Sequence, residues 1–257
     1  MITLGYPDSP DFKNFYPTNV LETGWEIITR WVSRMVMFGI YLTGDVPFRN
    51  VYLHGIVRAL DGRKMSKSLG NVINPDDYQK DFGTDSLRMG LIGGTANGKD
   101  FSFPHDKIVG YRNFLTKIWN MARFLLGRKE HDGLTINHEV ETLALAQEDK
   151  DILAKLKEAI KTVNESLEKY RFADAGETIY QFMWHDIADT YIEQTKNRED
   201  KEVALSVLAH VYTQGLKLLH PFMPFVTEKI YQTLRQEQIV SENDSQVLMV
   251  APWPKTE

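Results

Sequence analysis

The residues best suited to chemistry lie in one short segment rich in lysine, serine and glycine. From Arg58 to Lys67 the chain carries four basic residues and one acid, a local charge of +3 in a chain with a formal net charge of −5. Lys64 and Lys67 stand three residues apart between serine hydroxyls, and Gly70 follows them. A mobile cationic loop of this kind could offset the charge that develops on a leaving pyrophosphate. The alternative is a solvated basic hairpin that binds no ligand.

The elements upstream of this loop predict part of a nucleotide-binding fold. Residues 19–24 and 50–55 are strand-like, and residues 25–42 between them carry apolar side chains at helical spacing. Strand, helix and strand make a βαβ unit, whose loops at the carboxyl ends of the strands are available to ligands. Because one such unit cannot complete a doubly wound sheet, we expect residues 1–57 to be part of a Rossmann-type domain.

The middle of the chain, residues 58–107, is rich in glycine and turn signals. Asp61-Gly62 predicts a hairpin between two short runs. Asn74-Pro75 predicts the start of a short helix, with an asparagine cap and proline at the first helical position.

From residue 108 onwards the spacing of apolar residues is helical. The predicted helices cover residues 108–127, 149–170, 172–197, 201–220 and 224–237. They predict an antiparallel helical bundle. The predicted fold class is therefore mixed, with a partial Rossmann-type βαβ segment and a loop segment followed by a mostly α helical bundle.

Composition limits the class of protein. Apolar residues make up 42% and charged residues 25% of the chain, which excludes wholesale disorder. The absence of cysteine excludes disulfides, thiol catalysis and thiolate zinc sites. Seven histidines are scattered without an i, i+4 pair, so we expect no metal site. There is neither an apolar run of about 18 residues nor a signal-like start, so we expect a cytoplasmic protein.

Within the bundle, the first helix is the better candidate for phosphate contact. Residues 108–130 hold five basic residues and one acid, whereas residues 131–170 hold five basic and nine acidic residues. Lys117, Asn120 and Arg123 recur at helical spacing on one side. They either contact RNA or form hydrogen bonds inside the bundle.

The loop carries the run Lys64-Met65-Ser66-Lys67-Ser68, which resembles the second ATP-binding motif of class I aminoacyl-tRNA synthetases. Five specified residues in a row are a strong signal, and the half-fold upstream and the bundle downstream agree with it. No G-x-x-x-x-G-K-[ST] motif is present, which excludes a P-loop.

Nearly the whole chain resembles the valyl-tRNA synthetases of this class. The matching stretches are residues 15–24 and 31–35 of the catalytic part, and residues 113–124, 184–196 and 219–225 of the anticodon-binding part. Residues 93–100 look more like the valyl version than the isoleucyl one. An isoleucyl enzyme stays the alternative within the class.

The resemblance implies roles for individual residues. Lys64 and Lys67 would be catalytic, holding the ATP phosphates while the valine carboxylate attacks the α-phosphate. The implied ATP site comprises His54, Gly55, Lys64, Met65, Ser66, Lys67 and Ser68. The implied amino-acid pocket comprises Glu26, Ile27 and Trp31. The implied tRNA-binding residues are Arg112, Lys117, Asn120 and Arg123. Glu26 stands where the family usually has aspartate, so its carboxylate projects one methylene further. The implied substrates are ATP with Mg2+, valine and tRNA(Val), with no tightly bound cofactor.

Several parts of such an enzyme are absent from the sequence. It has no His-Ile-Gly-His-type motif, no editing domain and no C-terminal coiled coil. We therefore expect a fragment, or one product of a split gene whose partner is the missing N-terminal half, that does not activate valine alone. Two other interpretations stay open: a standalone RNA-binding module without catalysis, and a purely structural helical protein.

The resemblance also divides the chain into three domains. Residues 1–57 would be the C-terminal part of the Rossmann catalytic domain, residues 58–107 the signature loop and stem-contact segment, and residues 108–257 the anticodon-binding domain.

Overall fold

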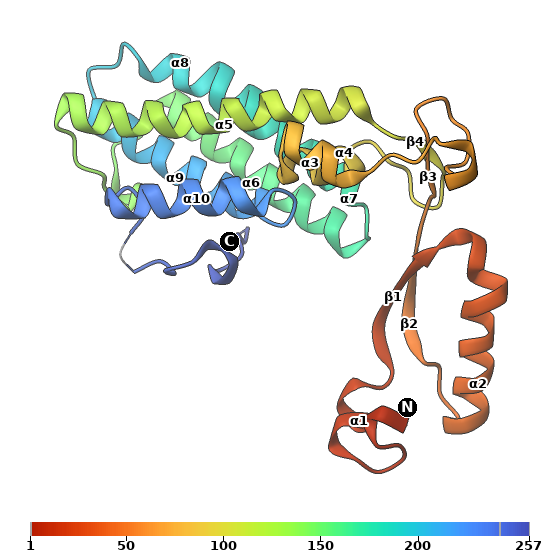
Figure 1. The fold of residues 1–257 in the computed structure, drawn as a ribbon. Helices are drawn as coiled ribbons and strands as arrows, with labels where there is room; N and C mark the ends of the chain where they lie inside the picture. The colour runs from red at the N-terminus through yellow and green to blue at the C-terminus, as the bar shows by residue number, and fades with distance from the viewer. Residues whose placement is uncertain (1, 242, 257) are drawn as a thin grey trace. The chain divides into compact units, whose positions relative to one another are not determined.

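The computed structural model describes residues 2–241 and 243–256, and the chain divides into two units (Figure 1). Unit 1 comprises residues 1–72 and 95–103, and unit 2 comprises residues 73–94 and 104–257. The backbone therefore passes between the units three times.

Unit 1 is built on two parallel strands, β1 (Thr18–Gly24) and β2 (Phe48–His54), in a register that pairs Gly24 with His54. The predicted βαβ unit is confirmed, but its helical part is divided. It runs through η2 (Trp25–Ile27) and the π-helical η3 (Ile28–Val32) before α2 (Ser33–Thr43). Bulky aromatic and β-branched residues between positions 25 and 32 are poor helix formers, which accounts for the irregular start. Before β1 lie η1 (Ile2–Leu4) and α1 (Pro10–Phe15).

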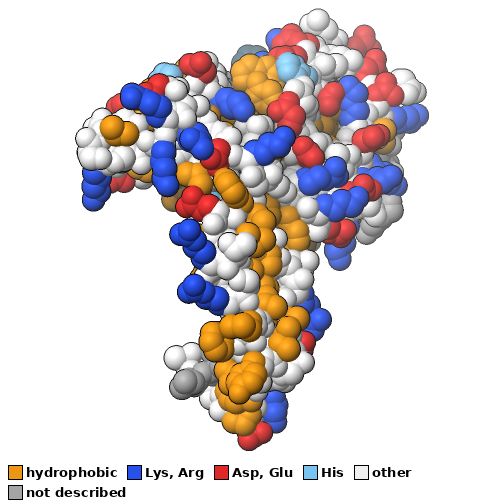
Figure 2. Space-filling model, turned by 90° about the vertical axis from the view of Figure 1, so that its right-hand side faces the viewer, with side chains coloured by type: hydrophobic (Ala, Val, Ile, Leu, Met, Phe, Trp, Pro, Cys, Tyr) orange, Lys and Arg blue, Asp and Glu red, His pale blue; other side chains and the backbone are white. Residues whose placement is uncertain are grey.

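Much of the apolar surface of unit 1 is exposed. In α2 only Gly39 is buried, while Phe38 is 54% and Tyr41 82% exposed. Figure 2 shows hydrophobic side chains gathered over the surface of this N-terminal unit. Contiguous exposed apolar patches are typical of surfaces that bind a partner, a ligand or a membrane.

The turn predicted at Asp61-Gly62 forms, and the Ala59 N–H donates across it to the Arg63 carbonyl at 2.9 Å, but no second strand follows directly among the described residues, so the predicted hairpin goes no further than this turn. Gly62 adopts φ +79° and its N–H donates to the carbonyl of Ala59 at 2.9 Å. Strand β3 (Val57–Arg58) then pairs in parallel with β4 (Phe101–Ser102), not with the residues after the turn. The difference arises because residues 97–103 return to the end of β2 and bind there through backbone and side-chain hydrogen bonds.

Unit 2 is the predicted helical bundle. Its helices are α3 (Pro75–Phe82), α4 (Thr84–Ile92), α5 (His105–Asp132), η5 (Val140–Thr142), α6 (Gln147–Glu168), α7 (Phe172–Gln181), the π-helical η6 (Phe182–Tyr191), α8 (Ile192–Thr195), α9 (Lys201–Leu219), α10 (Pro224–Gln236) and η7 (Leu248–Val250). Side chains such as Phe114, Ile118 and Val163 are fully buried between them. The predicted asparagine cap is present, because Asn74 Oδ1 accepts from the Asp76 N–H at 3.1 Å.

The segment with α3 and α4 is part of the bundle, although it lies far from α10 in sequence. The Asp85 carboxylate accepts the N–H groups of Phe225 at 3.3 Å and Val226 at 2.7 Å, which caps the start of α10. Arg88 donates to the carbonyls of Phe222 and Pro221 in the turn before it. Desolvation raises the pKa of Asp85, although these two N–H groups oppose the shift.

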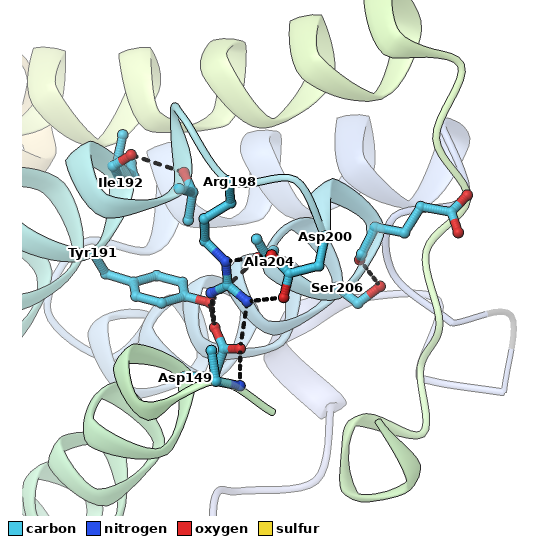
Figure 3. Close-up of polar contacts among 10 residues, drawn as sticks. Asp149, Tyr191, Ile192, Arg198, Asp200, Ala204 and Ser206 are labelled. Carbon is cyan, nitrogen blue, oxygen red and sulfur yellow. Dashed lines mark hydrogen bonds and ion pairs between the residues drawn. The ribbon is translucent and has the colours of Figure 1, made fainter. Parts of the chain in front are cut away.

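The loop between α8 and α9 is held by a buried ionic cluster (Figure 3). Arg198 Nη2 lies 2.8 Å from Oδ2 of the fully buried Asp149, and Arg198 Nε lies 2.8 Å from Oδ1 of Asp200. Tyr191 donates its hydroxyl to Asp149 at 2.5 Å. Burial would raise the pKa of Asp149, but the hydrogen bonds from Arg198 and Tyr191 outweigh it and lower this pKa. The cluster joins α6, η6 and the loop before α9.

Candidate active-site and RNA-binding residues

The signature loop is closed on itself by Asn71. The Asn71 side chain accepts the N–H of Ser66 at 2.8 Å and donates to the carbonyl of Lys64 at 3.2 Å. The hydroxyls of Ser66 and Ser68 lie 2.7 Å apart. Sequence reasoning assigned no role to Asn71, although an asparagine after a glycine turn is a known signal for side-chain bonding to the backbone.

The two signature lysines are free within the described part of the chain. Both Lys64 and Lys67 are exposed, and their ammonium groups make no hydrogen bond or ion pair with a described residue. Lys67 begins the short helix η4 (Lys67–Leu69), which Gly70 ends at φ +62°. Two unpaired cations on a loop with a fixed backbone are suited to an anionic ligand.

The predicted adenine segment lies at the end of β2. His54 Nδ1 is 2.9 Å from the carbonyl oxygen of Gly55, and Nε2 is 3.2 Å from Glu22 Oε1. Gly55 is buried, and a Cβ added to it would lie 1.7 Å from the carbonyl oxygen of Lys99. Only glycine fits at this position.

The predicted amino-acid pocket residues follow the end of β1. Glu26 and Ile27 lie in η2, and Trp31 in η3 is 45% exposed. Because Gly24 pairs with His54, the structure brings these residues and the adenine segment to neighbouring strand ends. The carboxyl ends of parallel strands are where nucleotide-binding folds place their ligands.

Asp100 is a site residue that sequence reasoning missed. Its Oδ1 accepts from the indole Nε1 of Trp25 and from the N–H of Ile56, both at 2.9 Å. Its Oδ2 accepts from Arg58 Nε at 3.1 Å. The hydrogen bond from Trp25, together with those from Ile56 and Arg58, lowers the pKa of Asp100 to about 2. Asp100 ends the stretch 93–100 that resembles the valyl enzymes, but nothing in that resemblance assigned it this role.

The four predicted tRNA-binding residues of α5 fall into two groups. Arg112 donates to the carbonyl of Asp81, and Lys117 Nζ lies 2.5 Å from Asp189 Oδ1 and 5.0 Å from the Trp184 ring centroid. The Lys117 hydrogen bond lowers the pKa of Asp189. Asn120 and Arg123 are exposed, and their side chains bond to no described residue. The first pair is engaged inside unit 2, and the second pair faces solvent.

Neither a metal-binding cluster nor a membrane-spanning helix occurs among the described residues. No group of three or more histidine, aspartate and glutamate side chains is arranged to hold a metal ion. None of the described helices combines the length and the apolar character needed to span a bilayer.

The chain matches two family models. Residues 1–104 match the class I tRNA synthetases (I, L, M and V), and residues 149–257 match the anticodon-binding domain of tRNA ligase. Curated relatives include the valine--tRNA ligases of Geobacillus kaustophilus (44% identical) and Listeria monocytogenes (42% identical), over 98% of this chain in each case. The chain spans 29% and 28% of their lengths.

Solved structures share the fold. The Agrobacterium radiobacter LeuRS, in a ternary complex with tRNA and LeuAMS, has a TM-score of 0.80 at 24% identity, covering 97% of this chain and 30% of that one. The Mycobacterium tuberculosis methionyl-tRNA synthetase with methionyl-adenylate has a TM-score of 0.73 at 24% identity, covering 99% and 53%. The two family models together match most of the chain, and they show that it joins a class I tRNA synthetase segment to the anticodon-binding domain of tRNA ligases.

Proposed function

We propose that this chain is the part of a valine--tRNA ligase that supplies the signature loop and the anticodon-binding bundle. The complete enzyme would join valine to tRNA(Val) through valyl-adenylate. The observation that carries the proposal is the pair of exposed lysines, Lys64 and Lys67, which bond to no described residue and lie on a loop whose backbone Asn71 holds. The 44% identity to valine--tRNA ligases favours valine over isoleucine.

In the proposed reaction, a valine carboxylate oxygen attacks the α-phosphorus of ATP and the bond to pyrophosphate breaks. Lys64 and Lys67 would balance the charge that develops on the leaving pyrophosphate, with Met65, Ser66 and Ser68 shaping the loop. Mg2+ would arrive with ATP as part of the substrate.

The adenine would lie against His54 and Gly55. Glu26, Ile27 and Trp31 would line the valine side, where an apolar pocket excludes larger side chains by size.

The structure supports a narrower RNA-binding set than the sequence did. Asn120 and Arg123 are free to contact RNA, whereas Arg112 and Lys117 would have to leave partners inside unit 2. By function, the proposed domains remain residues 1–57 for the end of the catalytic domain, 58–107 for the loop and stem contact, and 108–257 for anticodon binding, although α3 and α4 of the middle segment pack with the bundle.

The exposed apolar side chains of unit 1 support a second part of the proposal. We propose that the missing N-terminal half of the catalytic domain, on the same or a separate chain, covers this surface and completes the active site. The chain alone should then show no valine-dependent ATP–pyrophosphate exchange. The absence of cysteine fits a reducing compartment, and we propose the cytoplasm.

The test is a titration of the chain with tRNA(Val), repeated with an altered anticodon, with tRNA(Ile) and at two salt concentrations. A base-specific reader should lose about ten-fold in affinity for one wrong base, since such contacts contribute roughly 1–3 kcal/mol each. Preference for tRNA(Ile) would assign the isoleucyl alternative. Equal binding to all three RNAs that disappears steeply with salt would mean phosphate attraction alone and would contradict anticodon reading.

A further inference from the structure

One carboxylate, that of Asp100, lies where three functional segments of unit 1 meet. Trp25 directly precedes Glu26 and Ile27 of the proposed amino-acid pocket. Ile56 directly follows the proposed adenine segment, His54 and Gly55. Arg58 lies in β3, from which the chain continues into the signature loop. Asp100 bonds to all three of these segments.

The geometry of these bonds is specific. Oδ1 receives two donors, the indole N–H of Trp25 and the backbone N–H of Ile56, each at 2.9 Å. Oδ2 receives the guanidinium of Arg58 through Nε at 3.1 Å and Nη2 at 2.5 Å. The four hydrogen bonds use both carboxylate oxygens, and the guanidinium bonds are charge-assisted. A carboxylate with this set of partners has one orientation.

The backbone around Asp100 is fixed as well. The N–H of Gly98 donates to the carbonyl of Leu53 at 2.9 Å, and the N–H of Phe101 donates to the carbonyl of Ile56 at 3.3 Å. Between these two bonds, the carbonyl of Lys99 approaches Gly55 so closely that no side chain fits there. The segment that carries Asp100 is thus held against the end of β2 on both sides of the carboxylate.

We infer that Asp100 is a positioning residue that couples the amino-acid side of the adenylation site to the signature loop. It holds the Trp25 indole, at the start of η2, in a fixed position relative to Arg58. Arg58 lies in the strand from which the chain continues to Lys64 and Lys67. The inference rests on the proposed function, because it assigns Asp100 a role in ATP-dependent adenylate formation. Asp100 itself touches no reacting atom in this role.

The test uses the whole chain labelled with 15N, whose five tryptophans give separate indole signals. The variant Trp25→Phe identifies the Trp25 signal, and ATP with Mg2+ is the titrant. Wild-type chain should show a Trp25 shift that tracks ATP binding. Asp100→Asn keeps the size but cannot accept all four bonds. It should move the Trp25 signal without ATP, abolish its response to ATP and weaken ATP binding about ten-fold, as expected for one lost charge-assisted bond.

Two further variants separate coupling from simple loss of structure. Asp8→Asn, an exposed acid of unit 1, should behave as wild type. Arg58→Lys keeps the positive charge but removes the bidentate bond to Asp100, so it should also weaken ATP binding. If loss of the Trp31 signal shows that Asp100→Asn has unfolded unit 1, Arg58→Lys tests the coupling in its place. Signals from the bundle, such as that of Trp253, should stay in place.

The outcomes distinguish this inference from the proposed function. ATP affinity within two-fold of wild type in Asp100→Asn, with Trp25 still responding, would overturn the coupling and leave the proposed function intact. A wild-type chain whose signals ignore ATP altogether would overturn the coupling, which requires that unit 1 of this chain respond to ATP, while the tRNA titration would still test the proposed function.

Discussion

At the scale of single residues, polar side chains that helical spacing places on one side of α5 differ in whether they have a bonding partner. Lys117, Asn120 and Arg123 share one side of α5, yet Lys117 is paired with Asp189 while Asn120 and Arg123 face solvent. Helical spacing predicts a shared face but not which side chain finds a partner on the neighbouring helix. The partner, Asp189, is 72 residues away in sequence.

This difference leads to contrasting variants. Arg123→Gln should weaken tRNA binding uniformly across RNA sequences and reduce the slope of log affinity against log salt by about 1, since one phosphate contact is lost. Its unfolding free energy should be unchanged. Lys117→Gln should instead lower the unfolding free energy by about 0.5–1 kcal/mol, the range for a partly exposed pair. Salt titrations of tRNA binding and urea denaturation of both variants measure these two effects. If Arg123→Gln keeps the wild-type slope of log affinity against log salt, Arg123 does not contact the RNA.

At the scale of elements, the buried cluster of Asp149, Tyr191 and Arg198 is the most consequential polar feature of unit 2. None of its hydrogen bonds was predicted, because three segments that are separate in sequence contribute to it. The cluster holds the loop at which the chain reverses between α8 and α9. A buried charge without its partner is costly, so the loop geometry depends on all three side chains.

Arg198→Met tests the cluster directly. It leaves the fully buried Asp149 without its cation, so we expect the unfolding free energy of the bundle to fall by about 3–5 kcal/mol. Urea denaturation followed by circular dichroism measures the change. The matched control is Arg171→Met, which removes an exposed pair with Asp174 at 3.6 Å and should cost less than about 1 kcal/mol. Equal costs in the two variants would refute the structural role of the cluster.

Helix packing also gives the bundle a pH dependence. Burial lowers the pKa of His210, with a further contribution from Lys217, and burial likewise lowers the pKa of His220. Both imidazoles therefore resist protonation when folded but accept protons near pH 6.5 when unfolded. The free energy of unfolding should have its full value above about pH 6.5 and should decrease as the pH falls below that value.

Urea midpoints at pH 7.5 and 5.5 measure this dependence. The midpoint should be lower at pH 5.5, and His210→Gln should reduce the difference between the two conditions. His138→Gln, which removes an exposed histidine that bonds to no described residue, should leave the difference as it is. A midpoint that rises on acidification would show that the sign is wrong.

Regular elements were predictable because each depends on local sequence. Apolar spacing placed the bundle helices close to their observed bounds, and Asn74-Pro75 marked the start of α3. The pairing of β3 with β4 was not predictable, since it depends on the bonds of Asp100 and on a close approach of the Lys99 carbonyl to Gly55 that only glycine allows. In the candidate site, the signature loop was recognisable from five adjacent residues, whereas Asn71 and Asp100 act through folded geometry.

At the scale of the whole molecule, α3 and α4 belong to the bundle although they precede residue 108. A chain of residues 108–257 loses the Asp85 cap on α10 and the Arg88 bonds to the preceding turn. We expect it to melt at a lower temperature than a chain of residues 104–257 joined to 73–94 by a short linker. Thermal unfolding of the two chains measures this, and equal melting temperatures would mean that α4 contributes nothing to the bundle.

The three passages of the backbone between the units also determine what a protease would leave behind. A single cut between residues 72 and 73 yields two polypeptides, but unit 1 then consists of one piece from each. The β3–β4 pair and the Arg58–Asp100 contact would lie across the cut and hold the pieces together. The nicked protein would run as two bands on a denaturing gel and elute as one species under native conditions, a heterodimer made from a single gene.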